Sequence, residues 1–238
     1  MARLPRLVVP FQAHHIIQRG ADRRPIFLDD EDHEIFMRRL AEASKTFKVA
    51  IHAYVLMPNH LHLLATPADE TGLARMMQWV GRHYVPYFNK KYRRFGTLFQ
   101  GRYRATLIDS ELYFMLCSRY IELNPVRSGI CSRPEDFRWS SYAHHAGIAP
   151  DPLVTDHALY WSLANTPFGR EAAYRALAEQ AISLLEATEL SNATLKGWAL
   201  GSDKFKSRIE KLTSRRVTPE KGGRRFSVNE PPTQPDPA

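Results

Sequence analysis

Two short apolar segments joined by a turn constrain the fold of this chain most. Residues 49–56 and 61–66 are dominated by aliphatic side chains, and Pro58-Asn59 between them is a common turn pair. Apolar runs of this length, bounded by turn residues, are typical of buried strands. We therefore expect an antiparallel hairpin. Because two strands alone are marginally stable in water, the rest of the chain must supply further strands and covering helices.

The surrounding segments predict those partners. Short β-branched stretches predict two more strands, and apolar residues three and four positions apart predict three helices. In chain order the predicted elements are a strand at 14–19, a helix at 34–47, the hairpin, a helix at 72–91, a strand at 103–108 and a helix at 112–123. This order predicts an α+β fold with a ferredoxin-like antiparallel sheet and helices on one face.

The composition changes beyond residue 145. Pro-containing breaks are followed by helical patterns, then by a strongly basic stretch, and the last residues are rich in Pro and poor in apolar side chains. We expect a main catalytic domain at 1–145, a helical annex at 146–214, and a basic, then Pro-rich, disordered tail at 215–238.

The charge balance indicates a polyanionic partner. The chain holds 33 Lys and Arg against 25 Asp and Glu, a net charge of +8, and cations that neutralise phosphates release bound counterions. No run of about 20 apolar residues indicates a membrane span, and the N-terminus lacks an apolar signal region. We expect a cytoplasmic, nucleoid-associated protein. Its two cysteines form no CxxC pair, which argues against a thiolate zinc site.

His60 and His62 are the first candidate site residues. Residues two apart in a strand point to the same face, so both imidazoles can converge on one metal ion. A histidine pair alone is weak evidence, because histidines in strands are more often structural.

Tyr120 and Asn124 form the second marker. Residues four apart share a helix face, although Pro125 places Asn124 at the last turn or just beyond it. Two imidazoles and an amide oxygen suit Mg²⁺ or Mn²⁺ when phosphate oxygens complete the coordination. A phenol beside that ion can attack a phosphodiester. The alternative is that Tyr120 is a buried structural aromatic.

Residues 82–104 interleave cations with aromatic side chains, which is typical of surfaces that contact a phosphate backbone and stack unpaired bases. A solvated helix face is the alternative, and Arg127 could equally pair with Glu122 or Asp136. The candidate DNA contacts are Arg19, Arg82, Lys90, Lys91, Arg93, Arg94, Arg102, Arg104 and Arg127.

Four strings together resemble one family. They are His15-Ile-Ile-Gln-Arg-Gly20, Met57-Pro-Asn-His-Leu-His-Leu-Leu64, Gly101-Arg-Tyr-Arg104 and Tyr120-Ile-Glu-Leu-Asn-Pro-Val-Arg127. Over residues 3–225 the chain resembles the REP-associated tyrosine transposases, which are single-tyrosine HUH nucleases. The resemblance implies metal ligands at His60, His62 and Asn124, and a nucleophile at Tyr120.

The resemblance also implies an activity. It is that of a metal-dependent single-stranded DNA endonuclease and strand transferase, acting beside REP-like hairpins through a 5′-phosphotyrosine intermediate, as a monomer or homodimer. Two other functions stay open. One is a non-catalytic hairpin-binding protein derived from such an enzyme, and the other is a metal-dependent phosphoesterase that uses water, with Tyr120 structural.

Overall fold

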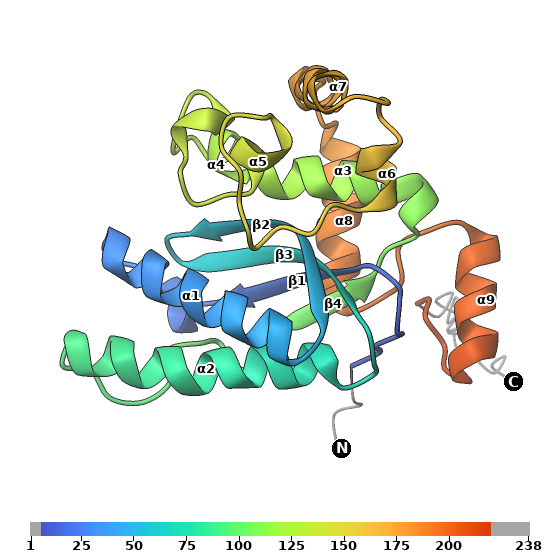
Figure 1. Ribbon diagram of the computed structural model, residues 1–238. Helices are drawn as coiled ribbons and strands as arrows, with labels where there is room; N and C mark the ends of the chain where they lie inside the picture. Colours follow the sequence, from blue (N-terminus) through green and yellow to red (C-terminus); the bar gives the residue numbers. More distant parts are fainter. Residues whose placement is uncertain (1–5, 220–238) are drawn as a thin grey trace, which may run out of the picture.

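The computed structural model describes residues 6–219, and its first half follows the predicted order of elements (Figure 1). The elements are β1 (His14–Arg19), α1 (Asp30–Thr46), β2 (Val49–Met57), β3 (His60–Pro67), α2 (Gly72–Lys91) and β4 (Arg104–Leu107). The Asp29 side chain caps α1 by accepting a hydrogen bond from the Asp32 backbone N–H. The Pro58-Asn59 turn joins β2 to β3, as predicted.

The four strands form one antiparallel sheet in the order β2-β3-β1-β4. This strand order, with α1 and α2 on one face, is the ferredoxin-like arrangement of a split βαβ unit. Leu61, Leu63 and Ala65 alternate along β3 and pack into the core beneath the two helices. Burying each leucine contributes roughly 1.5–3 kcal/mol. The predicted α+β class is confirmed.

The third predicted helix, α3 (Ser110–Glu122), lies on the other face of the sheet, whereas we expected helices on one face only (Figure 1). The reason is that the central strands are apolar on both sides. Val55 and Met57 of β2 and Leu64 of β3 point away from α1 and α2, and they pack with Phe114 of α3 in a second core. A sheet that is apolar on both faces needs cover on both.

The remaining helices follow α3. They are α4 (Asn124–Arg127), α5 (Tyr142–His145), α6 (Ala158–Trp161), α7 (Pro167–Glu179), α8 (Leu184–Lys196) and α9 (Asp203–Thr213), with short 3-10 turns at Ala21–Arg23 and Pro134–Asp136. A reciprocal capping box of Ser183 and Glu186 starts α8. Through Ala187 and Leu190, α8 joins the second core, so this part of the chain lies against the sheet face that carries α3.

The end of the chain was only partly anticipated. The basic stretch includes α9, which lies within the predicted helical annex although we singled out no helix at these residues, and its Phe205 and Ile209 pack with Val9 and Leu107. The tail predicted at 215–238 falls largely outside the described residues, which end at 219. From residue 6 to 219, no helix has both the length and the apolar character needed to cross a bilayer. Cys117 and Cys131 are free thiols.

Candidate active site

The sheet face beneath α3 collects the predicted histidines. In the β1–β3 register, His62 lies opposite Ile17, and His60 lies opposite Arg19. Both imidazoles therefore point to the α3 face, as their two-residue spacing predicts, with ring centroids 5.0 Å apart. His62 is almost fully buried, whereas His60, next to the turn, is half-buried. One ring is thus fixed inside the protein and the other borders solvent.

Tyr120 reaches the same face from α3. Its ring centroid lies 5.9 Å from that of His62, and its hydroxyl is 2.8 Å from Ser191 Oγ on α8. The guanidinium of Arg127 lies over the phenol ring, 4.5 Å from its centroid. Glu122, which we considered as a partner of Arg127, is occupied elsewhere. Arg127 instead stands beside the tyrosine.

Asn124 completes the predicted group. It lies two residues beyond the end of α3 and opens the short α4, with Pro125 next, so the helix ends where that proline predicts. The Asn124 side chain lies near the His60 ring, whose Nδ1 is 2.7 Å from Asn59 Oδ1. Side chains from β3, α3 and α4 therefore meet on one face of the sheet.

A third histidine, which our sequence analysis did not single out, lies behind His62. His15 Nε2 is 2.8 Å from His62 Nδ1, and His15 Nδ1 is 2.7 Å from Thr194 Oγ1 of α8. The alternation along β1 places His15 on the same face as Arg19, a residue that we did select, so the strand pattern could have identified it. No such signal marks Ser191 or Thr194, which lie more than 70 positions along the chain from Tyr120.

Burial sets the protonation of these rings. It lowers the pKa of His15 to about 3 and that of His60 to about 4. The charge of Arg19 lowers the pKa of His60 further, and the hydrogen bond with Asn124 opposes both effects. Burial, and then the neighbouring imidazoles and guanidiniums, hold the pKa of His62 well below its ordinary value. All three rings are neutral at pH 7, the form of histidine that binds metals.

The donor atoms fit a hard divalent cation. His62 Nε2 makes no hydrogen bond to any residue between 6 and 219, so this ring nitrogen has no partner within the described protein. Two imidazole nitrogens and an amide oxygen leave several coordination positions for phosphate oxygens or water, as Mg²⁺ and Mn²⁺ require. In the described part of the chain, no group of three or more His, Cys, Asp or Glu side chains could hold a metal, so a site here would need the Asn124 oxygen beside the two imidazoles.

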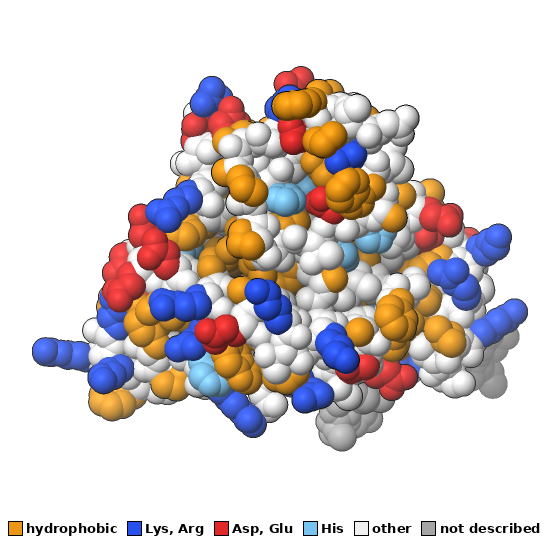
Figure 2. All heavy atoms as spheres, in the orientation of Figure 1, with side chains coloured by type: hydrophobic (Ala, Val, Ile, Leu, Met, Phe, Trp, Pro, Cys, Tyr) orange, Lys and Arg blue, Asp and Glu red, His pale blue; other side chains and the backbone are white. Residues whose placement is uncertain are grey.

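The predicted DNA contacts fall into separate places. Arg19 and Arg127 border the site described above, whereas Arg82 and Lys90 are exposed on α2, across the sheet from Tyr120. Figure 2, drawn from the α1–α2 side, shows Lys and Arg side chains along the rim of that face. Arg93 and Arg94 follow α2 in the loop to β4.

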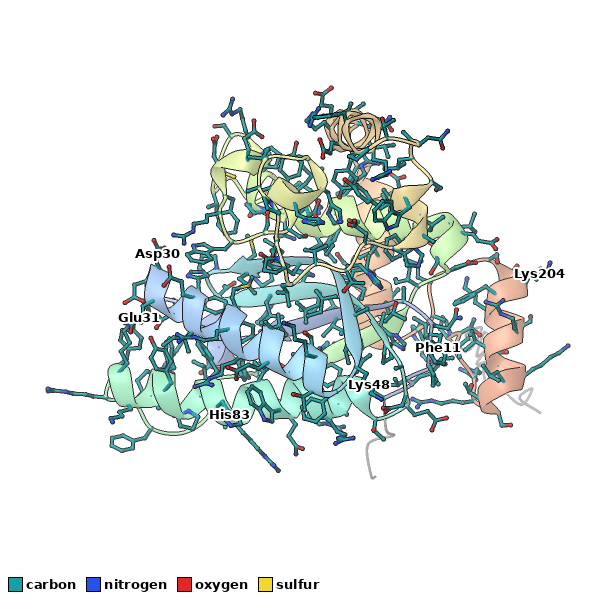
Figure 3. The ribbon with its side chains drawn as sticks, viewed as in Figure 1. Phe11, Asp30, Glu31, Lys48, His83 and Lys204 are labelled. Atoms are coloured by element: carbon teal, nitrogen blue, oxygen red, sulfur yellow. The ribbon has the colours of Figure 1, made fainter. Side chains whose placement is uncertain are left out.

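Lys91 is already paired within the protein. Its ammonium lies 2.7 Å from Asp29, 2.8 Å from Glu31 and 3.1 Å from Asp32, all at the start of α1. Figure 3 labels Asp30 and Glu31 at this end of α1. Lys91 therefore joins α2 to α1, and its charge is largely offset by these carboxylates.

Arg102 and Arg104 lie at the other edge of the sheet, beside α8. They line a cavity of about 320 Å³ together with Arg6, Lys196 and Arg215, and no acidic residue between 6 and 219 lines it. Arg104 donates a hydrogen bond to the Leu195 carbonyl oxygen at the end of α8. This cavity is the second place where predicted phosphate-binding cations gather.

A separate buried network lies two residues beyond the tyrosine. The Glu122 carboxylate, which is fully buried, accepts hydrogen bonds from Ser141 Oγ, His145 Nδ1 and Tyr174 Oη. The distance to His145 Nδ1 is 2.7 Å. The network connects α3 to α5 and α7, and it lies away from the sheet histidines.

Comparison with known proteins gives a family and a fold. Residues 10–124 match the family model described as Transposase IS200 like, a range that includes His60, His62, Tyr120 and Asn124. No curated protein matches the sequence.

Two solved structures are similar to this chain. One is described as the structure of the REP-associated tyrosine transposase bound to a REP hairpin. It has a TM-score of 0.51 and 17% identity, over 66% of this chain and 96% of that one. The other is a putative transposase from Deinococcus radiodurans R1, with a TM-score of 0.37 and 16% identity, over 48% of this chain and 92% of that one. The first likeness shows that 66% of the present chain has the fold of that transposase, and that this part corresponds to 96% of the other chain.

Proposed function

Because residues 10–124 carry an IS200-like transposase domain, we propose that this protein cleaves and rejoins single-stranded DNA beside hairpins through a phosphotyrosine on Tyr120. The observation that carries the proposal is the approach of Tyr120 to His62, with ring centroids 5.9 Å apart, on the face where His60 and Asn124 also meet. The related transposase bound to a REP hairpin supports a hairpin substrate.

The residues around Tyr120 have distinct tasks in this reaction. The phenol oxygen attacks the scissile phosphorus, forms a bond to the 5′ phosphate and displaces the 3′ oxygen of the preceding nucleotide. The phenol must lose its proton during attack, and Ser191, 2.8 Å away, holds its hydroxyl beforehand. Arg127, over the ring, and Arg19, opposite His60, offset negative charge on the phosphate.

His60, His62 and Asn124 would hold a Mg²⁺ or Mn²⁺ ion. When bound, such an ion would polarise the phosphate and orient it for in-line displacement. The phosphotyrosine keeps the energy of the broken phosphodiester bond. A second 3′ hydroxyl can therefore attack the phosphorus, release Tyr120 and join two DNA ends without ATP.

The DNA contacts follow from where the cations lie. Arg19 and Arg127 would contact the cleaved strand, and the basic cavity lined by Arg102 and Arg104 would hold another part of the backbone. The exposed cations of and after α2 (Arg82, Lys90 and Arg93), together with the half-buried Arg94, would meet duplex DNA of the hairpin. Lys91, paired with α1, has the weakest support. Because all the proposed site residues approach one another within one chain, we infer that a monomer can complete its own site.

The test uses hairpin oligonucleotides with single-stranded flanks, labelled at the 5′ or the 3′ end, incubated with Mn²⁺ or Mg²⁺. On denaturing gels we expect protein linked to the 3′-labelled fragment and a free 5′-labelled fragment with a 3′ hydroxyl. Both products should disappear when EDTA is added.

Two outcomes would replace the proposal. Hairpin binding without any adduct, over a panel of flanking sequences and both metals, would indicate a non-catalytic binding protein. Metal-dependent cleavage that survives Tyr120→Phe would indicate that water is the nucleophile.

A further inference from the structure

We propose that His15 and Thr194 are positioning residues that determine which nitrogen of His62 carries the proton, so that His62 Nε2 faces the site as a free lone pair. The proposal rests on the function proposed above, in which His62 is a metal ligand. It assigns a task to α8, a helix outside the matched transposase domain.

The direction of the hydrogen bonds is set at Thr194. This fully buried hydroxyl lies 2.9 Å from the Leu190 carbonyl oxygen, one turn earlier on α8, and a carbonyl can only accept. Because a hydroxyl has one proton, Thr194 Oγ1 must accept the other hydrogen bond, from His15 Nδ1 at 2.7 Å. His15 therefore carries its proton on Nδ1.

The same assignment of one proton to each hydrogen bond extends to His62. His15 is fully buried and makes no ion pair with a carboxylate among residues 6–219, so a charge on its ring would be costly. A neutral imidazole with a proton on Nδ1 offers only a lone pair at Nε2. His62 Nδ1, 2.8 Å away, must then donate to it. Neutral His62 is left without a proton on Nε2.

The opposite arrangement would disable the site. If Thr194 donated to His15 Nδ1, then His15 Nε2 would donate to His62 Nδ1, and the His62 proton would move to Nε2. A metal could bind that nitrogen only after the proton had left or the ring had turned. The back-bond from Thr194 to Leu190 is the contact that favours the productive arrangement. Groups that accept a hydrogen bond from the second ring nitrogen of a metal-binding histidine orient that ring. Mutating them changes metal affinity by about 10- to 100-fold.

Helix α8 thus contacts the candidate site twice. Thr194 acts on His62 through His15, and Ser191, three residues earlier, holds the Tyr120 hydroxyl at 2.8 Å. The two contacts lie about one helical turn apart on the same side of α8. The proposal concerns the Thr194 contact alone. Ser191 is a second polar residue on the same side of α8 that contacts Tyr120 and not His15.

Two variants test the assignment. Thr194→Val keeps the shape of the side chain but removes the hydroxyl, and Thr194→Ser keeps the hydroxyl. The first measurement is long-range ¹⁵N–¹H NMR of the histidine rings in the metal-free full chain. It needs no DNA and no activity. We expect a proton on Nδ1 of His62 in the wild type and in Thr194→Ser, and a mixture of tautomers in Thr194→Val.

The second measurement is Mn²⁺ binding by titration calorimetry in the absence of DNA. We expect about 10- to 100-fold weaker binding for Thr194→Val, and wild-type affinity for Thr194→Ser. A purely structural role for Thr194 would change the unfolding temperature without changing the tautomer. Thermal unfolding of both variants therefore accompanies the titration.

A proton on Nε2 of His62 in the wild-type chain would overturn the proposal, and this observation requires no variant to fold. Equal Mn²⁺ affinity in the wild type and in a folded Thr194→Val would overturn it as well. If the tautomer and the Mn²⁺ affinities are as expected but no DNA is cleaved, the proposed function fails and the assignment of His15 and Thr194 stands.

Discussion

Two buried polar clusters touch α3 only two residues apart, and they differ in what they leave open. At Glu122, the carboxylate receives hydrogen bonds from Ser141, His145 and Tyr174, so its acceptor positions are filled within the protein. At Tyr120, the neighbouring His62 keeps one ring nitrogen without any partner among residues 6–219. A buried network that satisfies itself stabilises the fold, whereas a buried ring nitrogen left without a partner beside a nucleophile indicates chemistry.

The two clusters also differ in charge. Burial lowers the pKa of His145, but the charge of Glu122 and its hydrogen bond outweigh that effect and leave the pKa raised. His62 has no carboxylate beside it, and burial leaves its pKa well below the ordinary value. The Glu122 cluster thus favours an imidazolium, and the Tyr120 cluster favours neutral rings that can bind a metal.

The largest expected effect is the loss of the covalent DNA adduct when the Tyr120 cluster loses its phenol hydroxyl. Tyr120→Phe should reduce adduct formation by at least about 10³-fold, because it removes the nucleophile. Hairpin affinity should change by less than about fivefold, since only one hydroxyl is lost. Gel-based adduct assays and fluorescence anisotropy measure the two quantities. The control is Tyr113→Phe on the same helix, whose hydroxyl lies 3.3 Å from Glu189 and outside the site. Equal loss of adduct in both variants would contradict the assignment of Tyr120.

The second effect concerns stability. Glu122→Gln leaves His145, Ser141 and Tyr174 facing an amide in place of a carboxylate, and breaking a buried ion pair costs about 3–5 kcal/mol. Urea unfolding should show this loss. Glu111→Gln, an exposed residue on the same helix, should stay within about 0.5 kcal/mol of the wild type. A Glu122→Gln protein as stable as that control would mean that the network contributes little to the fold.

The third effect is a dependence on pH that has opposite signs for the two kinds of histidine. The raised pKa of His145 stabilises the fold below about pH 6.5, and this contribution is lost as pH rises through the raised value. The difference in unfolding free energy between the wild type and Glu122→Gln should therefore shrink as pH increases above 6.5.

The neutral histidines act in the other direction. Burial lowers the pKa of His14 and His52 to about 4, so their contribution is present above pH 6.5 and is lost as pH falls towards 4. Urea unfolding at pH values from about 4 to 9 measures both contributions to the free energy of unfolding. A wild-type protein whose stability rises steadily as pH falls to 4 would contradict the assignment of neutral buried rings.

The smallest effect is expected at Ser191. Removing its hydroxyl leaves Tyr120 without a 2.8 Å partner, and one hydrogen bond is worth about 1 kcal/mol net. Single-turnover kinetics should show adduct formation about fivefold slower in Ser191→Ala. Asn192→Ala, exposed on the same helix, should behave like the wild type. A Ser191→Ala rate as low as that of Tyr120→Phe would show that Ser191 takes part in the chemistry itself.

Local patterns predicted the sheet and half of the candidate site. Two features of the site follow from residues close together in the sequence, and the structure has both as expected. They are the shared direction of His60 and His62 and the end of α3 before Pro125. The helix at residues 72–91 was predicted with the bounds found in the structure. Periodicity is informative when one face of an element is buried.

The parts that were missed depend on distant contacts. The apolar residues on both sides of β2 and β3 gave no indication of which face α3 would cover, because that choice depends on how the helix packs. In the sequence, nothing distinguishes Thr194 and Ser191 from other polar residues of a helix. Their roles depend on the packing of α8 against β1 and α3. In α9, the basic residues around Phe205 and Ile209 obscured the helical pattern in the sequence. The burial of these two side chains against Val9 stabilises the helix.

The most direct test of the account is to locate the covalent bond. The full chain would be incubated with Mn²⁺ and a hairpin oligonucleotide, digested with protease and nuclease, and analysed by tandem mass spectrometry. The account predicts a nucleotide 5′-phosphate on the peptide that contains Tyr120, at that residue and at no other tyrosine. An adduct on a different residue, or cleaved DNA without any adduct, would contradict it.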